Sequence, residues 1–183
     1  MANPDNPAQV FIVEDNDPDV FLVREALRSE GVQAQIQRCH DGEEGIRALS
    51  QIVEGGLPDV ILIDLNLPKV SGLEVLKHVR SLKQLDRVPV LILTSSQSPA
   101  DRALSLQLGA DAYIAKPPTL PEFLSSVGAG VRNLLERSQK QSGTRGRGTR
   151  GHGTRGSVTR GFSRVSATRG FSRVLPKRVL RSL

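Results

Sequence analysis

Val-Ile-Leu-Ile-Asp at residues 60–64 is a short apolar run that ends abruptly in an acidic residue. Three further runs have this form: VFIV at 10–13 before Glu14 and Asp15, VLIL at 90–93 before Thr94, and AYIA at 112–115 before Lys116. A fifth run, AQIQRC at 34–39, is less apolar. Continuous apolar runs without alternation are typical of strands that are buried on both faces of a parallel sheet. The chain is therefore predicted to be built around such a sheet.

Helix-start signals occupy the segments between these runs. Each pairs a capping side chain with a proline or an acidic residue at the expected spacing: Asp17 with Pro18, Ser71 with Glu74, Ser98 with Pro99, and Thr119 with Glu122. Asp41 precedes a further segment of helical period, which is predicted to stop at Gly55-Gly56. Strand and helix thus alternate five times, which predicts an α/β fold with a doubly wound parallel sheet. The periodicity does not fix the strand order.

The charge divides the chain into two parts. Residues 1–136 hold all 19 acidic residues and 12 of the 25 basic ones, whereas residues 137–183 hold 13 basic residues and no acidic one. The second part repeats Thr-Arg-Gly and is rich in glycine, a composition that favours disorder. We expect one domain over residues 8–138 and a disordered, basic, Gly/Arg-rich tail over 139–183.

Several classes of protein are excluded by what the sequence lacks. The first residues show no signal-peptide pattern, and the apolar runs stop far short of the roughly 20 residues that a membrane span needs. Cys39, the only cysteine, has no partner for a disulfide and no companion ligands for zinc. A cytoplasmic protein is therefore expected.

Acidic residues should gather at one edge of the sheet. Because ligands of open parallel sheets bind at the carboxyl ends of the strands, Glu14, Asp15 and Asp64 should converge there. Two carboxylates about 4 Å apart repel by about 4 kcal/mol at an effective dielectric near 20, so such a cluster favours a bound cation. All-oxygen ligands favour Mg²⁺. The alternative is that these carboxylates are simply solvated.

The motifs together resemble a known family. VEDN at 13–16, DLNLPKVSG at 64–72, LTSS at 93–96 and AYIAKP at 112–117 resemble the receiver domain of two-component response regulators. The resemblance implies a flavodoxin-like (βα)5 fold with strand order 2-1-3-4-5. Within the family, the chain is similar to stand-alone receivers, some of which serve phytochrome-type histidine kinases.

The resemblance also implies a role for each site residue. Asp64 resembles the phosphoacceptor, and Lys116 and Thr94 resemble the groups that assist the transfer. The implied Mg²⁺ ligands are Asp15, Glu14 through water, Asp64 and the backbone carbonyl of Asn66. Thr94 and Tyr113 resemble the switch pair. A second interpretation of Tyr113 is a half-buried aromatic with its hydroxyl in water. Lys116-Pro117 resembles the family's cis peptide bond.

The expected function is that of a phosphorylated signalling protein. The resemblance implies a single-domain response regulator that takes a phosphoryl group from a histidine kinase onto Asp64 with Mg²⁺, catalyses this transfer itself, and loses the group slowly. A haloacid-dehalogenase-type phosphatase is disfavoured because Asn66 stands where that chemistry needs an aspartate. The output partner and a homodimer are left open.

The basic tail leaves an alternative function open. It is either a low-complexity extension or a segment that binds nucleic acid or an anionic surface through its charge. In the second case, the alternative is a phosphorylation-inert receiver-like module that presents a nucleic-acid-binding tail.

Overall fold

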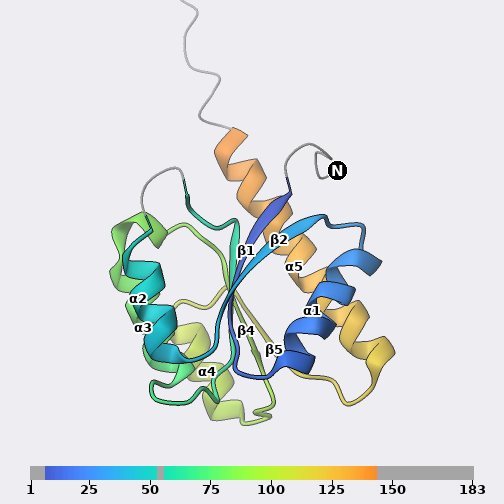
Figure 1. Cartoon of the computed structure of the whole chain (residues 1–183), viewed down its shortest axis with the longest axis horizontal. Coiled ribbons are helices and arrows are strands. Elements are labelled where there is room, and N and C mark those ends of the chain that lie inside the picture. The colour runs from blue at the N-terminus through green and yellow to red at the C-terminus, as the bar shows by residue number, and fades with distance from the viewer. Residues whose placement is uncertain (1–6, 53–55, 144–183) are drawn as a thin grey trace, which may run out of the picture. The chain divides into compact units, whose positions relative to one another are not determined.

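The computed structural model describes residues 7–52 and 56–143 (Figure 1). The predicted boundary at residues 138/139 falls inside the last helix, which continues to Gly143. Residues 139–143 are therefore helical, and no glycine or proline stands between Gly130 and Gly143 to end the helix earlier. The rest of the predicted tail, residues 144–183, lies outside the described residues.

Five parallel strands form one sheet in the order β2-β1-β3-β4-β5. The strands are β1 (Ala8–Val13), β2 (Ala34–Cys39), β3 (Val60–Ile63), β4 (Val90–Thr94) and β5 (Ala112–Ala115). The helices are α1 (Asp17–Ser29), α2 (Gly42–Ser50), α3 (Gly72–Ser81), α4 (Pro99–Gln107) and α5 (Leu120–Gly143), with a short 3-10 turn η1 (Lys83–Leu85) after α3. The predicted flavodoxin-like fold and its strand order are confirmed.

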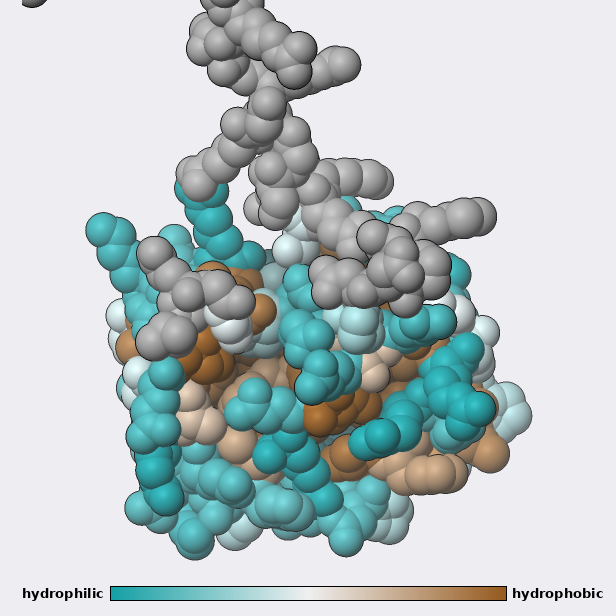
Figure 2. Space-filling view, turned by 45° about the horizontal axis from the view of Figure 1, so that its top comes forward, coloured by the Kyte–Doolittle hydropathy of each residue, from teal (hydrophilic) through white to brown (hydrophobic). Residues whose placement is uncertain are grey.

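Helices cover both faces of the sheet, as continuous apolar strands require. In Figure 1, α1 and α5 lie on one side of the strands and α2 and α3 on the other. Val10 and Ile12 of β1 join the core under α1 and α5, whereas Phe11 and Val13 join the core on the opposite face. On the surface seen in Figure 2, hydrophilic side chains predominate and hydrophobic atoms show in patches between them.

Most of the predicted helix starts are confirmed by hydrogen bonds between the capping side chain and a backbone N–H of the first turn. Ser71 and Glu74 form a capping box at the start of α3, and Ser98 accepts the backbone N–H of Asp101 at the start of α4. Asp41 likewise accepts the backbone N–H of Glu44.

The capping role predicted for Asp17 is wrong. Asn16 occupies the N-cap position, and the Asp17 carboxylate pairs with Arg38 of β2. The charged guanidinium of Arg38 lies beside this loop, so the Asp17 carboxylate pairs with it rather than with a backbone N–H of α1. Helix α2 also ends at Ser50, before the predicted stop at Gly55-Gly56.

Gly72 brings α3 against the end of β3. A Cβ at this position would lie 1.9 Å from the backbone oxygen of Asp64. Gly72 therefore allows the backbone to approach Asp64, the residue that follows β3, and no rearrangement of a flexible side chain could relieve the clash of an added Cβ.

We expect Gly72→Ala to lower the free energy of unfolding by about 3 kcal/mol, because the backbone of Asp64 must move. Gly31→Ala is the control. Gly31 has φ +69° but no atom within 4 Å of its Cβ position, so only about 1 kcal/mol should be lost. Urea denaturation measures both variants, and equal losses would contradict the close approach as the cause.

No helix in residues 7–52 and 56–143 is long and apolar enough to cross a membrane.

Candidate functional site

Three carboxylates meet at the carboxyl edge of the sheet. Glu14 and Asp15 follow β1, and Asp64 follows β3, its direct neighbour in the sheet. One oxygen from each of the three lies within 4.8 Å of the others. The predicted convergence is therefore present. Carboxylate oxygens grouped so closely have the donor chemistry that a hard divalent cation such as Mg²⁺ requires, so these residues fit that ion.

Lys116 supplies the positive charge at this edge. Its Nζ lies 2.8 Å from Glu14 Oε2, 2.7 Å from Asp64 Oδ2 and 2.7 Å from Asp19 Oδ2. The lysine follows β5, so residues more than fifty positions apart in sequence are joined directly. An ammonium has three hydrogens, and each of them is directed at one carboxylate.

Burial and charge act against one another in this cluster. Burial lowers the pKa of Lys116, but hydrogen bonds to Asp19, Asp64 and Glu14 outweigh that effect and hold the pKa above its ordinary value. Burial raises the pKa of Glu14 to about 7, although the Lys116 ammonium opposes this rise. Glu14 is only 3% exposed, so its charge is poorly solvated. One lysine does not neutralise all the carboxylates around it.

The raised pKa of Glu14 predicts a pH dependence of the metal-free protein. The folded protein binds the Glu14 proton more tightly than the unfolded chain does, and this difference stabilises the fold. The stabilisation is complete below about pH 4.5 and is lost as the pH rises through about 7. Relative to Glu14→Gln, which stays neutral, the wild type should lose up to about 3 kcal/mol of unfolding free energy over this range. Urea denaturation in EDTA at a series of pH values measures the difference. Parallel pH profiles for the two proteins would contradict it.

Asp64, Asn66 and Thr94 form a connected group beside Lys116. Asp64 Oδ1 accepts the backbone N–H of Asn66 at 3.0 Å. The Asn66 side-chain amide donates to Thr94 Oγ1 at 3.5 Å and to Ser95 Oγ at 3.0 Å. Thr94 is fully buried, whereas Asp64 is 5% exposed. The structure therefore brings the predicted phosphoacceptor close to the predicted threonine.

Tyr113 points inward from β5. The residue is 7% exposed, and its hydroxyl donates to the backbone oxygen of Ser96 at 2.9 Å. The guanidinium of Arg102 lies 5.7 Å from the ring centroid. The interpretation of a half-buried tyrosine with its hydroxyl in water is therefore wrong, because the β4–α4 segment supplies an acceptor that replaces water.

The Lys116-Pro117 peptide bond is trans, as are the other peptide bonds of the described residues. The expected cis bond is therefore wrong for this structure. Trans is the form that X-Pro bonds intrinsically prefer. The lysine is oriented by the carboxylates of Glu14, Asp19 and Asp64, which lie 2.7 to 2.8 Å from its Nζ.

Two residues at this edge were not predicted from the sequence. Asp19 in the first turn of α1 contacts Lys116, and Arg38 of β2 donates to the backbone oxygens of Glu14 and Asp15, both at 2.9 Å. Arg38 thus holds the loop that carries two of the carboxylates. The acidic first turn of α1 was the only sequence signal for Asp19. The position of Arg38 follows from the pairing of β2 with β1, which periodicity does not reveal.

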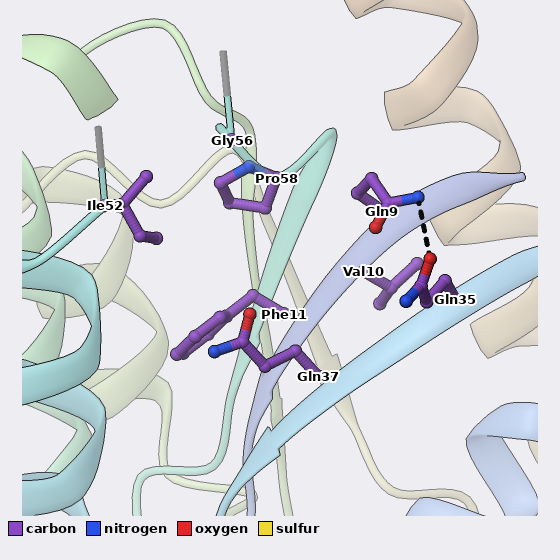
Figure 3. Close-up of a pocket in the computed structure, with 8 residues that line it drawn as sticks. All are labelled: Gln9, Val10, Phe11, Gln35, Gln37, Ile52, Gly56 and Pro58. Carbon is purple, nitrogen blue, oxygen red and sulfur yellow. Dashed lines mark hydrogen bonds between the residues drawn. The ribbon is translucent and has the colours of Figure 1, made fainter. Parts of the chain in front are cut away.

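A separate hollow lies at the other end of β1 (Figure 3). Gln9, Phe11, Gln37 and Pro58 are among the residues that line it, and Gln9 donates to Gln35 across β1 and β2 at 3.4 Å. Ile52 and Gly56 also line it, and residues 53–55 between them are outside the described part of the chain. It contains none of the clustered carboxylates.

Sequence comparisons agree with this geometry. The model of the response regulator receiver domain matches residues 10–128. The transcriptional regulatory protein TrcR of Mycobacterium tuberculosis is 38% identical over 133 residues, which cover 73% of this chain and 47% of TrcR. The chain spans about half the length of the curated transcriptional regulators that it matches in this way. The response regulator Rcp1 of Synechocystis is 34% identical over 131 residues, 69% of this chain and 89% of Rcp1.

Solved structures give the same result. The phosphorylated cyanobacterial phytochrome response regulator RcpA superposes with a TM-score of 0.66 at 35% identity, covering 72% of this chain and 96% of RcpA. The Mn²⁺-bound form of Rcp1 superposes with a TM-score of 0.64 at 32% identity, covering 71% of this chain and 96% of Rcp1. The match of the family model to most of the folded part, together with these relatives, shows that the chain belongs to the response regulator receiver domain family.

Proposed function

We propose that the chain is a response regulator in which Asp64 accepts a phosphoryl group from the phosphohistidine of a histidine kinase. One observation carries the proposal: the Asp64 carboxylate lies among two further carboxylates and is contacted by Lys116 at 2.7 Å. A buried carboxylate with a cation fixed beside it is suited to hold transferred anionic oxygens. The family membership supports the same assignment.

The transfer needs no separate base. A carboxylate oxygen of Asp64 offers its own lone pair and can attack the phosphorus directly. A new O–P bond forms as the P–N bond of the phosphohistidine breaks, and the electron pair of that bond stays on the imidazole nitrogen of the kinase. Lys116 and the backbone N–H of Asn66 already contact the two oxygens of Asp64 and hold its orientation.

Mg²⁺ is the proposed cofactor of this site. Glu14, Asp15 and Asp64 would hold it, with the backbone carbonyl of Asn66 as a further ligand; the first three present oxygens within 4.8 Å of one another. When bound, the ion neutralises charge on the phosphoryl oxygens. The similarity to Rcp1, of which an Mn²⁺-bound form has been solved, supports a divalent ion as the cofactor.

Thr94 and Tyr113 are the proposed switch. Thr94 Oγ1 accepts from the Asn66 amide and, at 3.3 Å, from the backbone N–H of Ser96. Ser96 is also the acceptor for the Tyr113 hydroxyl. A phosphoryl oxygen on Asp64 would accept a hydrogen bond from the Thr94 hydroxyl and draw that side chain toward the site. This movement would shift the β4–α4 segment, whose Ser96 oxygen Tyr113 contacts. Phosphorylation is in this way coupled to the β4–α4 loop and β5.

The partners of the chain follow from the same proposal. A histidine kinase is the phosphodonor, and the similarity to the phytochrome response regulator RcpA favours a kinase of the phytochrome type. Such a kinase would deliver the phosphoryl group in the cytoplasm. The output protein and a homodimer are not specified by any described residue. The alternative of a phosphorylation-inert module is supported by no observation on residues 7–52 and 56–143.

Beryllofluoride tests the proposal, because this phosphoryl mimic needs both the aspartate and a divalent ion. NMR resonances of Thr94 and Tyr113 should shift when Mg²⁺ and beryllofluoride are both present, and much less with either alone. Unchanged resonances in the folded protein with both present would contradict it.

We also propose that the folded domain works without the basic tail. Because α5 continues to Gly143, the informative truncation is after that residue rather than after Ser138. A segment of this composition cannot recover its ordering entropy by burying a core. We expect the truncated chain to keep its unfolding free energy within about 0.5 kcal/mol and its response to beryllofluoride. Loss of folding on truncation would show that the tail is an integral part of the domain.

A further inference from the structure

Asp19 has no role in the site as proposed so far. It lies in the first turn of α1, outside the group of three carboxylates that could hold a cation. Its Oδ2 nevertheless lies 2.7 Å from Lys116 Nζ, as close as that of Asp64. Its side chain is 19% exposed and that of Lys116 is 12% exposed, so this ion pair is largely shielded from water.

A divalent ion and Lys116 need two of the same carboxylates. Two of the three acceptors of the ammonium, Glu14 Oε2 and Asp64 Oδ2, belong to the carboxylates that could hold the ion. The lysine therefore takes the place of a cation for these two groups. An ion bound there would draw their lone pairs away and repel the ammonium. Among the described residues, Asp19 is the one carboxylate outside the cation group that contacts the Lys116 ammonium.

We propose that Asp19 is a positioning residue that keeps Lys116 beside Asp64 when a divalent ion takes Glu14 and Asp64. This inference rests on the proposed function. Lysine is a compact charge on a flexible four-carbon stem, so it needs an anchor to stay at one place. Asp19 provides that anchor from the N-terminal turn of α1, where a carboxylate is also favoured by the helix dipole. The lysine is then ready to contact a phosphoryl group on Asp64.

The proposal fixes the sign of the effect on metal binding. Without Asp19, Lys116 keeps only the two carboxylates that the ion also needs, and it competes with the ion more strongly. We expect Asp19→Asn to weaken Mg²⁺ binding about three- to tenfold, the range for loss of one partly buried ion-pair partner. Glu122→Gln is the matched control, because it removes a carboxylate from the first turn of α5, and Glu122 is not among the contacts of Lys116.

A double-mutant cycle separates positioning from simple charge. Mg²⁺ affinity is measured by isothermal titration calorimetry on the full chain for the wild type, Asp19→Asn, Lys116→Met and the double variant, with circular dichroism to confirm folding. The proposal expects Asp19→Asn to weaken binding clearly more when Lys116 is present than in the Lys116→Met background. If Asp19→Asn lowered the Mg²⁺ affinity equally with Lys116 and with Lys116→Met, Asp19 would act only through its negative charge, and the proposal would be overturned.

A second result keeps the test independent of the double variant. If Asp19→Asn binds Mg²⁺ as well as the wild type or Glu122→Gln does, the proposal is wrong. Failure of the wild type itself to bind Mg²⁺ would instead count against the proposed function, so the two failures are distinguishable.

Discussion

Asp64→Asn is expected to abolish phosphoryl labelling of the chain by acetyl phosphate. The amide cannot act as the anionic nucleophile, and the other carboxylates at this edge lie toward the proposed metal ion or, as Asp19, on α1. Mass spectrometry of the intact protein measures the loss. The variant should still fold, because the amide is isosteric with the carboxylate.

Asp86→Asn is the control for this variant. Asp86 follows the η1 turn, is exposed and lies outside the carboxylate group, so its variant should label as the wild type does. Persistent labelling of Asp64→Asn would show that another residue is the acceptor.

Lys116→Met should strongly destabilise the metal-free protein. It leaves Glu14, Asp19 and Asp64 at the site without the ammonium that contacts all three. Removal of one partner from a buried ion pair costs about 3 kcal/mol or more. We expect a loss of about 3 kcal/mol in EDTA, measured by urea denaturation. Mg²⁺ should restore much of it, because the ion takes over neutralisation of the carboxylates.

Lys69→Met serves as the matched control. Lys69 pairs with Asp41 at 2.6 Å, but its side chain is 57% exposed, so less than about 1 kcal/mol should be lost. A metal-free Lys116→Met protein as stable as the wild type would mean that the three contacts contribute little. We also expect Lys116→Met to weaken the response of Tyr113 to beryllofluoride more than it weakens Mg²⁺ binding, as loss of an oriented charge beside the phosphoryl group requires.

The sequence alone predicted the sheet and the groups at its edge because both depend on one pattern. Each buried strand ends where the first polar residue appears, and parallel strands present those residues at the same edge. The pattern therefore predicts that Glu14, Asp64, Thr94 and Lys116 lie together. The resemblance then supplied the strand order, which the periodicity left open.

The contacts that the sequence did not predict all join residues across the fold. The pairing of β2 with β1 brings Arg38 to the backbone of Glu14 and Asp15, and its charge draws Asp17 away from a capping role. The contact of Lys116 with Asp19 joins the residue after β5 to the first turn of α1. The inward position of Tyr113 depends on a backbone oxygen in the β4–α4 segment. Such features require coordinates, because composition and spacing are unchanged by them.

The central claim is that Asp64 accepts a phosphoryl group with the help of a divalent ion. The direct measurement is peptide mapping by mass spectrometry of the full chain after acetyl phosphate, once with Mg²⁺ and once with EDTA. The account predicts a single phosphoryl group, on the peptide that contains Asp64, formed with Mg²⁺ and largely absent with EDTA. A folded, Mg²⁺-binding protein that gains no phosphoryl group, or gains it on another residue, would contradict the account.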